Sequence, residues 1–501
     1  MGHMKDACRV ISIYSNACIS DRSEYAVNLA AAIAKVTEKK VAFVDSTDQL
    51  KEISNEAGVS ILSPIEINPD MLEVYKREYG YIVINAHGGE GGLLYDILTC
   101  SDSVHFFTDS TVDNLKNARL FLKDLIKHDR KDIISRLKIV VCRLDVFDKL
   151  SEEEMSWILK KDIWAIVPES GILDPLIGSG GMPVVLRSSL TPYSTGVLRI
   201  AKKETSRLLG LALGSGAAFG LAHVGVIKVL EEKHIPVDVV SGSSMGALIA
   251  AMWGLGLSAA KIEQITMVLR KKLNIMRLMD FTIPVSGILA GARLKKFLRS
   301  ILGEKTFEDL KIPVKIMVYD LANRETVTMD KGRLLDAVFM SISVPGIFKP
   351  TVKKDKVYID GGVSDPVPVE VLANDGVNKI IAVNVLPGPQ DLYIRNMAVK
   401  NRLRQEEIQM LNSPFYIKCG LLIKARLRKI FTPNIFDVIM TSMQAMEYML
   451  AENSCRKASI ALHPVVADAT SIDFHLVKAF IEKGEKETRA CMEEIKRLAL
   501  R

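Results

Sequence analysis

The sequence predicts an α/β protein with two domains, each built on a mainly parallel sheet flanked by helices, and a helical C-terminal region. Short apolar runs alternate with helical patterns along both halves of the chain, as βαβ units require. The 501 residues exceed what one hydrophobic core organises. Charge also differs between the halves: residues 1–205 hold 25 Lys and Arg against 29 Asp and Glu, whereas residues 206–501 hold 41 against 30. We therefore expect separate domains with different partners.

The composition is that of a globular protein, with 48% hydrophobic and 25% charged residues. Seven cysteines without a Cys-x-x-Cys pair argue against a disulfide scaffold or a zinc site and favour a cytoplasmic location. The N-terminus lacks the apolar core of a signal peptide. The uncharged run 239–260 is long enough to span a bilayer, but its four glycines and four serines favour a strand–turn–helix motif instead.

Residues 8–205 are predicted to form the first domain. A helix is expected over 23–34, amphipathic in pattern, and the run Lys202–Glu204 is expected to open the linker to the second domain. Strands are predicted at 9–16, 40–45, 79–86, 103–108 and 137–145.

Residues 206–388 are predicted to form the second domain. Its first strand runs from Leu208 into a glycine loop, and a helix follows over 221–233. The strand at 236–240 leads through a tight turn into a helix ending near Trp253. Later strands are expected within 313–321, 356–362 and 379–387, and residues 389–501 are predicted as a basic segment and a helical extension packing on this domain.

A serine stands at the centre of the Gly242-Ser-Ser-Met-Gly246 turn. A G-x-S-x-G sequence between a strand and a helix lifts the serine hydroxyl, here that of Ser244, out of the sheet edge. The helix that follows directs its N-terminal dipole at this hydroxyl and favours developing negative charge. The alternative is that the small residues only permit a tight βα turn.

A glycine loop, Gly214 to Gly220, also joins a strand to a helix. Its backbone N–H groups can converge on an anion and form an oxyanion hole. The alternative is a nucleotide phosphate loop, but the Gly-Lys-Ser/Thr ending is missing and no acidic residue closes the next strand.

The general base is predicted to be Asp360. His463 and His475 follow the serine in sequence, but both lie in the helical tail without a strand end. Asp360 closes a predicted strand and precedes Gly361-Gly362, where burial can raise its pKa enough to accept a proton. Taken alone, Asp-Gly-Gly is more often simply a turn.

The order of these motifs over about 208–375 resembles the patatin-like phospholipases. The resemblance implies a Ser–Asp dyad with Ser244 as nucleophile and Asp360 as base. It also implies oxyanion support from the loop amides at Gly216, Ala217 and Ala218, and lipid acyl hydrolysis without a metal or other cofactor. The motif glycines are Gly214, Gly220, Gly242, Gly246, Gly361 and Gly362, and Ser341, Ser343 and Pro345 would shape the wall of the acyl pocket.

One position departs from this pattern, because Phe219 stands where the family usually has Arg or Lys before the last loop glycine. The lost cation is expected to reduce or alter activity, since the backbone donors remain. An inactive pseudoenzyme is the alternative.

Residues 9–205 resemble MinD/ParA-type ATPases, but their phosphate loop is degenerate. The stretch Ala17 to Ser23 lacks its glycines and lysine, and Asp21 would repel a phosphate. Asn85 replaces the metal-associated acid, while Asp45 is kept. We expect a domain that does not hydrolyse ATP, serves interaction or regulation, and forms a homodimer through the former nucleotide face.

Residues 395–429 carry nine Lys and Arg against two glutamates. An amphipathic helix from Ile423 would lie on the inner face of an anionic membrane, with Arg270–Lys272 adding to this surface. The alternative is a solvated surface helix. Nucleic-acid binding lacks a motif.

The sequence therefore predicts a peripherally membrane-associated phospholipase A-like serine hydrolase. The alternatives are a soluble carboxylesterase or lysophospholipase, and a catalytically inactive membrane-bound scaffold.

Overall fold

The computed structural model describes residues 8–16, 21–46, 58–62, 69–87, 93–144, 150–169, 182–188, 191–283, 286–353, 355–411 and 435–500. The chain divides into two compact units, Met1–Arg207 and Leu208–Arg501. The second unit begins two residues after the predicted start of the second domain.

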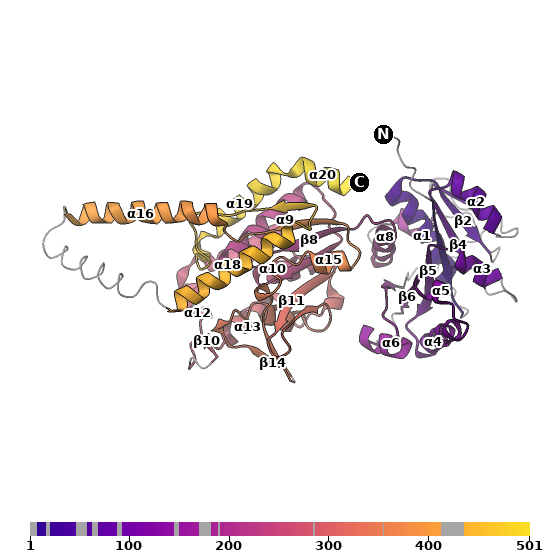
Figure 1. Cartoon of the computed structure of the whole chain (residues 1–501), viewed down its shortest axis with the longest axis horizontal. Helices are drawn as coiled ribbons and strands as arrows, with labels where there is room; N and C mark the ends of the chain where they lie inside the picture. Colours follow the sequence, from indigo (N-terminus) through magenta and orange to yellow (C-terminus); the bar gives the residue numbers. More distant parts are fainter. Residues whose placement is uncertain are drawn as a thin grey trace. The chain divides into compact units, whose positions relative to one another are not determined.

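The N-terminal unit is built on a parallel sheet in the order β3-β2-β4-β1-β5-β6-β7 (Figure 1). Its strands are β1 (Arg9–Tyr14), β2 (Val41–Asp45), β3 (Val59–Leu62), β4 (Tyr81–Asn85), β5 (Ser103–Asp109), β6 (Leu137–Arg143) and β7 (Ala165–Pro168).

Helices cover both faces of this sheet, because successive strand residues point to opposite sides and both sides are apolar. Ile11 and Ile13 pack on one face with α1 (Asp21–Thr37), α7 (Val184–Arg187) and α8 (Pro192–Glu204). Val10 packs on the other, which is covered by α2 (Pro69–Glu78), α3 (Leu93–Thr99), α4 (Val112–Lys127), α5 (Lys131–Ile134) and α6 (Glu152–Leu159).

Two sequence expectations for this unit are wrong. Helix α1 is not amphipathic: Tyr25 to Ala34 are buried on all sides, because the helix is enclosed by the sheet, α7 and α8. Glu204 does not open a linker either, since it ends α8 and is 1% exposed. Burial opposes its ionisation, but hydrogen bonds and charge from His105 and Lys138 hold the pKa of Glu204 at about 2.

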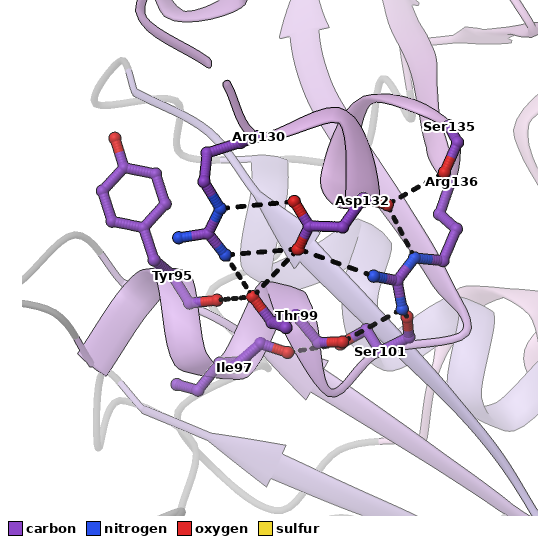
Figure 2. Close-up of polar contacts among 8 residues, drawn as sticks. All are labelled: Tyr95, Ile97, Thr99, Ser101, Arg130, Asp132, Ser135 and Arg136. Carbon is purple, nitrogen blue, oxygen red and sulfur yellow. Dashed lines mark hydrogen bonds and ion pairs between the residues drawn. The ribbon is translucent and has the colours of Figure 1, made fainter. Parts of the chain in front are cut away.

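A polar network ties α3 to α5 at the surface of this unit (Figure 2). The Arg130 guanidinium bonds both carboxylate oxygens of Asp132 at 3.3 Å and also contacts the Thr99 hydroxyl. Arg136 donates to the carbonyl oxygens of Asp132, Thr99 and Ser101. Arginine thus satisfies carbonyls at the end of α3, a structural role for these charges.

The C-terminal unit contains an eight-stranded mixed sheet in the order β14-β15-β11-β9-β8-β16-β17, with β12 also paired to β11. The strands are β8 (Leu209–Leu213), β9 (Val239–Ser243), β11 (Val314–Asp320), β12 (Glu325–Met329), β14 (Thr351–Lys353), β15 (Lys356–Asp360), β16 (Lys379–Val383) and β17 (Ile460–Leu462). A separate pair joins β10 (Gly287–Leu289) to β13 (Gly346–Phe348). The predicted fold class is confirmed, with antiparallel strands at one edge of this second sheet.

One face of this sheet packs on α9 (Ala222–Glu232), α10 (Met245–Gly254), α11 (Ala259–Thr266), α13 (Ala292–Leu302), α14 (Leu334–Ser341), α19 (Val477–Ala490) and α20 (Met492–Leu500). Ala451 and Cys455 of α18 (Ile435–Cys455) and Leu372 of α15 (Glu370–Asn374) pack on the other face. Among the described residues, this unit also contains the α-helices α12 (Lys272–Leu278) and α16 (Pro389–Leu411).

The region after residue 388 belongs to this unit. Strand β17 extends the sheet beside β16, a strand that the sequence did not predict. Helix α19 crosses α9 with backbones in contact: a Cβ at Gly484 would lie 2.0 Å from the Ala222 carbonyl oxygen. Glycine is needed there because no side chain fits between the two helices. In the described part of the chain, no helix is both long and apolar enough to span a membrane.

Candidate active site

Ser244 stands between the end of β9 and the first residue of α10. Its φ of +54° and ψ of −120° are strained for a residue other than glycine, as in a nucleophile elbow. Strand β9 runs to Ser243, so the predicted strand 236–240 was placed three residues too early. The sharp turn depends on small neighbours, since a Cβ at Gly246 would lie 2.2 Å from the Leu213 carbonyl oxygen.

Ser341 at the end of α14 holds this elbow in place. The Ser244 N–H donates to the Ser341 hydroxyl at 2.9 Å, and that hydroxyl donates to the Met317 carbonyl at 2.7 Å. The strained turn is therefore anchored to strand β11, which pairs with β9.

Asp360 is the last residue of β15 and directly faces Ser244. The Ser244 hydroxyl donates to Asp360 Oδ2 at 2.6 Å, and the Gly362 N–H donates to Oδ1 at 2.7 Å. The Asp360 N–H donates to the Ser343 carbonyl at 3.0 Å. Both carboxylate oxygens are thus fixed, with one of them pointing at the candidate nucleophile.

Burial raises the pKa of Asp360 to about 7, although the hydrogen bonds from Ser244 and Gly362 lower it. The carboxyl is 2% exposed and the Ser244 residue 4% exposed, so both are largely withdrawn from water. A carboxylate with a pKa near neutrality is a far better proton acceptor than an ordinary aspartate. This arrangement is chemically suited to deprotonate a serine hydroxyl.

The glycine loop lies at the same edge of the sheet, after β8. The Gly214 and Ser215 amides are bonded to the carbonyls of Val383 and Pro366, and the Ala218 amide donates to Ser471 at 3.0 Å. The Gly216 and Ala217 amides make no hydrogen bond to any described residue. Of the three predicted oxyanion donors, Gly216 and Ala217 are therefore available, whereas Ala218 is already engaged.

Phe219 points into the core instead of toward the dyad. It is 3% exposed and meets Phe480 of α19 edge-on, with ring centroids 5.9 Å apart. The residue that departs from the family pattern thus contributes to the attachment of the C-terminal helices.

The candidate histidines are engaged elsewhere. His463 bonds Glu452 at 2.9 Å, and His475 lies 3.7 Å from Asp473. His223, which the sequence did not single out, donates from Nε2 to the Gly214 carbonyl at 2.8 Å, and complete burial lowers its pKa to about 4. A neutral His223 therefore supports the start of the glycine loop.

Three further residues bear on this candidate site, and the sequence analysis did not single out one of them. Ser341 and Ser343, which the resemblance implies for the wall of an acyl pocket, donate their hydroxyls to the backbone carbonyls of Met317 and Phe339. Glu447 of α18 was not singled out, although it is the one charged residue in the mostly apolar stretch Met443–Leu450. It is 8% exposed, and the charge of Asp360 acts on it.

In the N-terminal unit, three residues of the degenerate nucleotide site meet at the sheet edge. The Asn85 amide donates to the Asp45 carboxylate at 2.8 Å and to the Ser23 hydroxyl at 3.0 Å. Residues 17–20 of the former phosphate loop lie outside the described residues, as does the predicted amphipathic helix from Ile423.

Comparisons with known proteins show what the two parts of the chain are similar to. Residues 211–373 match the family model of patatin-like phospholipases. Neuropathy target esterase sws of Drosophila melanogaster is 33% identical over 197 residues, which are 38% of this chain and 14% of that protein. An uncharacterised NTE family protein of Mycobacterium bovis is 32% identical over 190 residues, 38% of this chain and 51% of that protein. The chain thus spans about half or less of the length of these curated relatives.

Among solved structures, a MinD cell division protein of Aquifex aeolicus is similar in fold at 20% identity and a TM-score of 0.33, covering 39% of this chain and 96% of that one. A ParA family ATPase of Chlorobium tepidum is similar at 19% identity and a TM-score of 0.34, covering 38% of this chain and 98% of that one.

Proposed function

We propose that this protein is a serine lipid acyl hydrolase that cleaves fatty acyl esters of phospholipids through a Ser–Asp dyad. The observation that carries the proposal is the 2.6 Å hydrogen bond from the Ser244 hydroxyl to Asp360 at a strained strand–helix turn. The match of residues 211–373 to patatin-like phospholipases and the names of the relatives support the same reaction class.

Acylation begins when Ser244 Oγ attacks the carbonyl carbon of the ester and Asp360 takes the hydroxyl proton. The negative charge that develops on the carbonyl oxygen is stabilised by the Gly216 and Ala217 amides and by the N-terminus of α10. The intermediate then collapses: the bond to the alcohol oxygen breaks, and that oxygen takes the proton from Asp360.

Deacylation repeats these steps with water as the nucleophile. Asp360 accepts a proton from the water as it attacks the acyl-enzyme, and the proton returns to Ser244 when the fatty acid leaves. The dyad needs no third member to orient it, because Gly362 and Ser343 already fix the Asp360 carboxylate and backbone.

Covalent labelling tests this proposal. A fluorophosphonate should label the wild type and fail to label Ser244→Ala, while Asp360→Asn should be labelled about 10²–10⁴-fold more slowly because the base is lost. Ser243→Ala is the matched control: this neighbouring buried hydroxyl has no hydrogen-bond partner among the described residues, so labelling should persist. Labelling of Ser244→Ala at the wild-type rate would refute the assignment of the nucleophile, whereas a wild type that is not labelled at all would favour an inactive scaffold.

Peripheral contact with an anionic membrane is the second part of the proposal. Around α12, four large apolar side chains are 59–77% exposed: Leu273, Met276, Phe281 and Ile283. Four exposed basic residues, Arg270, Lys271, Lys272 and Arg277, lie in the same segment. We call these eight residues the α12 patch. An apolar surface bordered by cations suits a bilayer with anionic headgroups.

Vesicle co-sedimentation tests the membrane contact. The wild type should sediment with vesicles containing phosphatidylglycerol, less so in high salt, and Phe281→Glu with Ile283→Glu should weaken sedimentation. The exposed Trp157 of the N-terminal unit offers a control, Trp157→Glu, that should sediment normally. Hydrolysis of dissolved short-chain esters without vesicle binding would instead favour a soluble carboxylesterase or lysophospholipase.

For the N-terminal unit we propose a non-hydrolysing interaction module that forms a homodimer. Support comes from the Asn85 amide that holds Asp45, which leaves this retained acid bonded within the protein. Light scattering of the full chain should give twice the monomer mass without ATP, and a monomer at all concentrations would refute the dimer.

A further inference from the structure

Glu447 is a buried carboxyl that the dyad mechanism does not use. It lies on α18, the helix that runs across the sheet of the C-terminal unit in Figure 1. Helix α18 packs against residues Gly361–Val363, directly after Asp360. A charged residue is costly at this depth unless something compensates it.

Two observations place Glu447 in the neighbourhood of the proposed reacting groups. One turn earlier on the same helical face, the Gln444 amide donates to the Ser471 hydroxyl at 3.1 Å, and the Ser471 carbonyl accepts from Ala218 in the glycine loop. On the other side, the carboxylate of Asp360 is close enough for its charge to act on Glu447. The helix that carries Glu447 is thus linked to the oxyanion loop through Gln444 and Ser471, and it packs on the residues that follow the base.

The Glu447 carboxyl makes no hydrogen bond to any described residue. Neighbouring polar residues of α18 have other partners. Glu452 accepts a hydrogen bond from Asn384 and is hydrogen-bonded to His463, and the Tyr448 side chain lies against Gly388. Asp365 lies beyond residues 361–363, and the charged groups that act on its pKa are Glu370 and Lys457. Asp360 is therefore the charged group among the described residues that acts on Glu447.

We propose that Glu447, in its protonated form, is a further catalytic residue that donates a hydrogen bond to the alcohol part of the bound ester; this inference rests on the proposed function. With no hydrogen-bond partner among the described residues, the protonated Glu447 carboxyl has a donor to offer to an acceptor on the bound substrate. In the proposed mechanism the carbonyl oxygen of the ester accepts hydrogen bonds from the Gly216 and Ala217 amides. The acyl chain contains no hydrogen-bond acceptor. The acceptors that remain lie on the alcohol side.

Burial, with a further contribution from the Asp360 charge, raises the pKa of Glu447 to about 8. The group is consequently protonated at neutral pH and can donate. Its proton stays on Glu447 throughout, while the Ser244 proton travels through Asp360 to the leaving oxygen. Above pH 8 the ionised carboxyl loses its donor and repels the oxygens of the ester.

The decisive measurement is the pH profile of kcat/KM for a monoacylglycerol ester, corrected for the Ser244→Ala background. The wild type should lose activity about tenfold per pH unit above pH 8. Glu447→Gln keeps an N–H donor that cannot ionise, so its profile should stay flat to pH 9.5. The matched control Glu452→Gln, five residues further along α18, should keep the wild-type decline.

A second variant separates the donor from the charge. Glu447→Leu should lower kcat/KM about tenfold for the glycerol ester and much less for a 4-nitrophenyl ester of the same acid, whose alcohol part lacks hydroxyls. An alkaline decline that persists in Glu447→Gln, or equal losses on both esters, would overturn the role of Glu447 alone. Hydrolysis that survives Ser244→Ala would overturn the proposed function itself.

Discussion

Acylation of Ser244 should slow sharply as the pH falls below neutrality. In the proposed mechanism the serine proton is transferred only when Asp360 is ionised, and burial raises the pKa of this carboxyl from 3.8 to about 7. The perturbation is therefore simply a change of pH from 8 to 5, with no mutation needed.

The expected magnitude follows from the ionised fraction of Asp360. With a pKa of about 7, roughly 1% of the carboxyl is ionised at pH 5, so the labelling rate should fall about 100-fold. With the ordinary value of 3.8, more than about 90% would remain ionised at pH 5 and the rate would hardly change. The two cases differ by about two orders of magnitude.

The assay is the rate of fluorophosphonate labelling between pH 5 and 8, with circular dichroism at each pH to establish that the protein stays folded. Asp360→Asn should be slow throughout and show no inflection near pH 7. Wild-type labelling at pH 5 within threefold of that at pH 8 would refute the conclusion that a buried, high-pKa carboxylate is the base.

Three further outcomes are expected. Ser341→Ala removes the acceptor of the Ser244 amide and the donor to the Met317 carbonyl. The free energy of unfolding, measured in urea, should therefore fall by about 1–3 kcal/mol, and labelling should slow. Unchanged stability would contradict this expectation. Gly246→Ala would force a Cβ to within 2.2 Å of a backbone oxygen, and we expect loss of soluble, cooperatively melting protein; a normal thermal melt would contradict it. Burial lowers the pKa of His223 from 6.5 to about 4. As the pH falls, the histidine therefore takes up a proton in the unfolded chain at a higher pH than in the folded protein. The free energy of unfolding should consequently drop by about 3 kcal/mol between pH 6.5 and pH 4. His223→Gln should show a smaller decrease over that range, and an equal decrease would rule out His223 as its source.

The sequence was most informative where the chemistry is local. The small residues around Ser244 and the glycines that follow Asp360 and β8 are close to each strand end in the chain, so local spacing alone indicates turns there. The alternation of strands and helices likewise predicted both sheets, because hydrophobic period is a local property.

Elements that depend on distant partners were missed or misread. Helix α1 looked amphipathic because no local signal shows that helices and a sheet enclose it from every side. Strand β17 is three residues long and is a strand only because it pairs with β16. Residue 204 looked like part of a linker until His105 and Lys138 were seen to surround its carboxylate.

By itself, the sequence determined the fold class and the nucleophile turn, and by resemblance it identified Ser244 and Asp360 as a pair. Only the tertiary structure decided that they meet, 116 residues apart in the chain. The physical reason is register: β11 pairs with β9 and β15 so that Met317 lies opposite Ser243 and Val318 opposite Asp360. The same packing buries the Asp360 carboxyl, raises its pKa, and brings Glu447 on a distant helix within range of its charge. Burial and register arise from contacts between remote segments, which no short stretch of sequence contains.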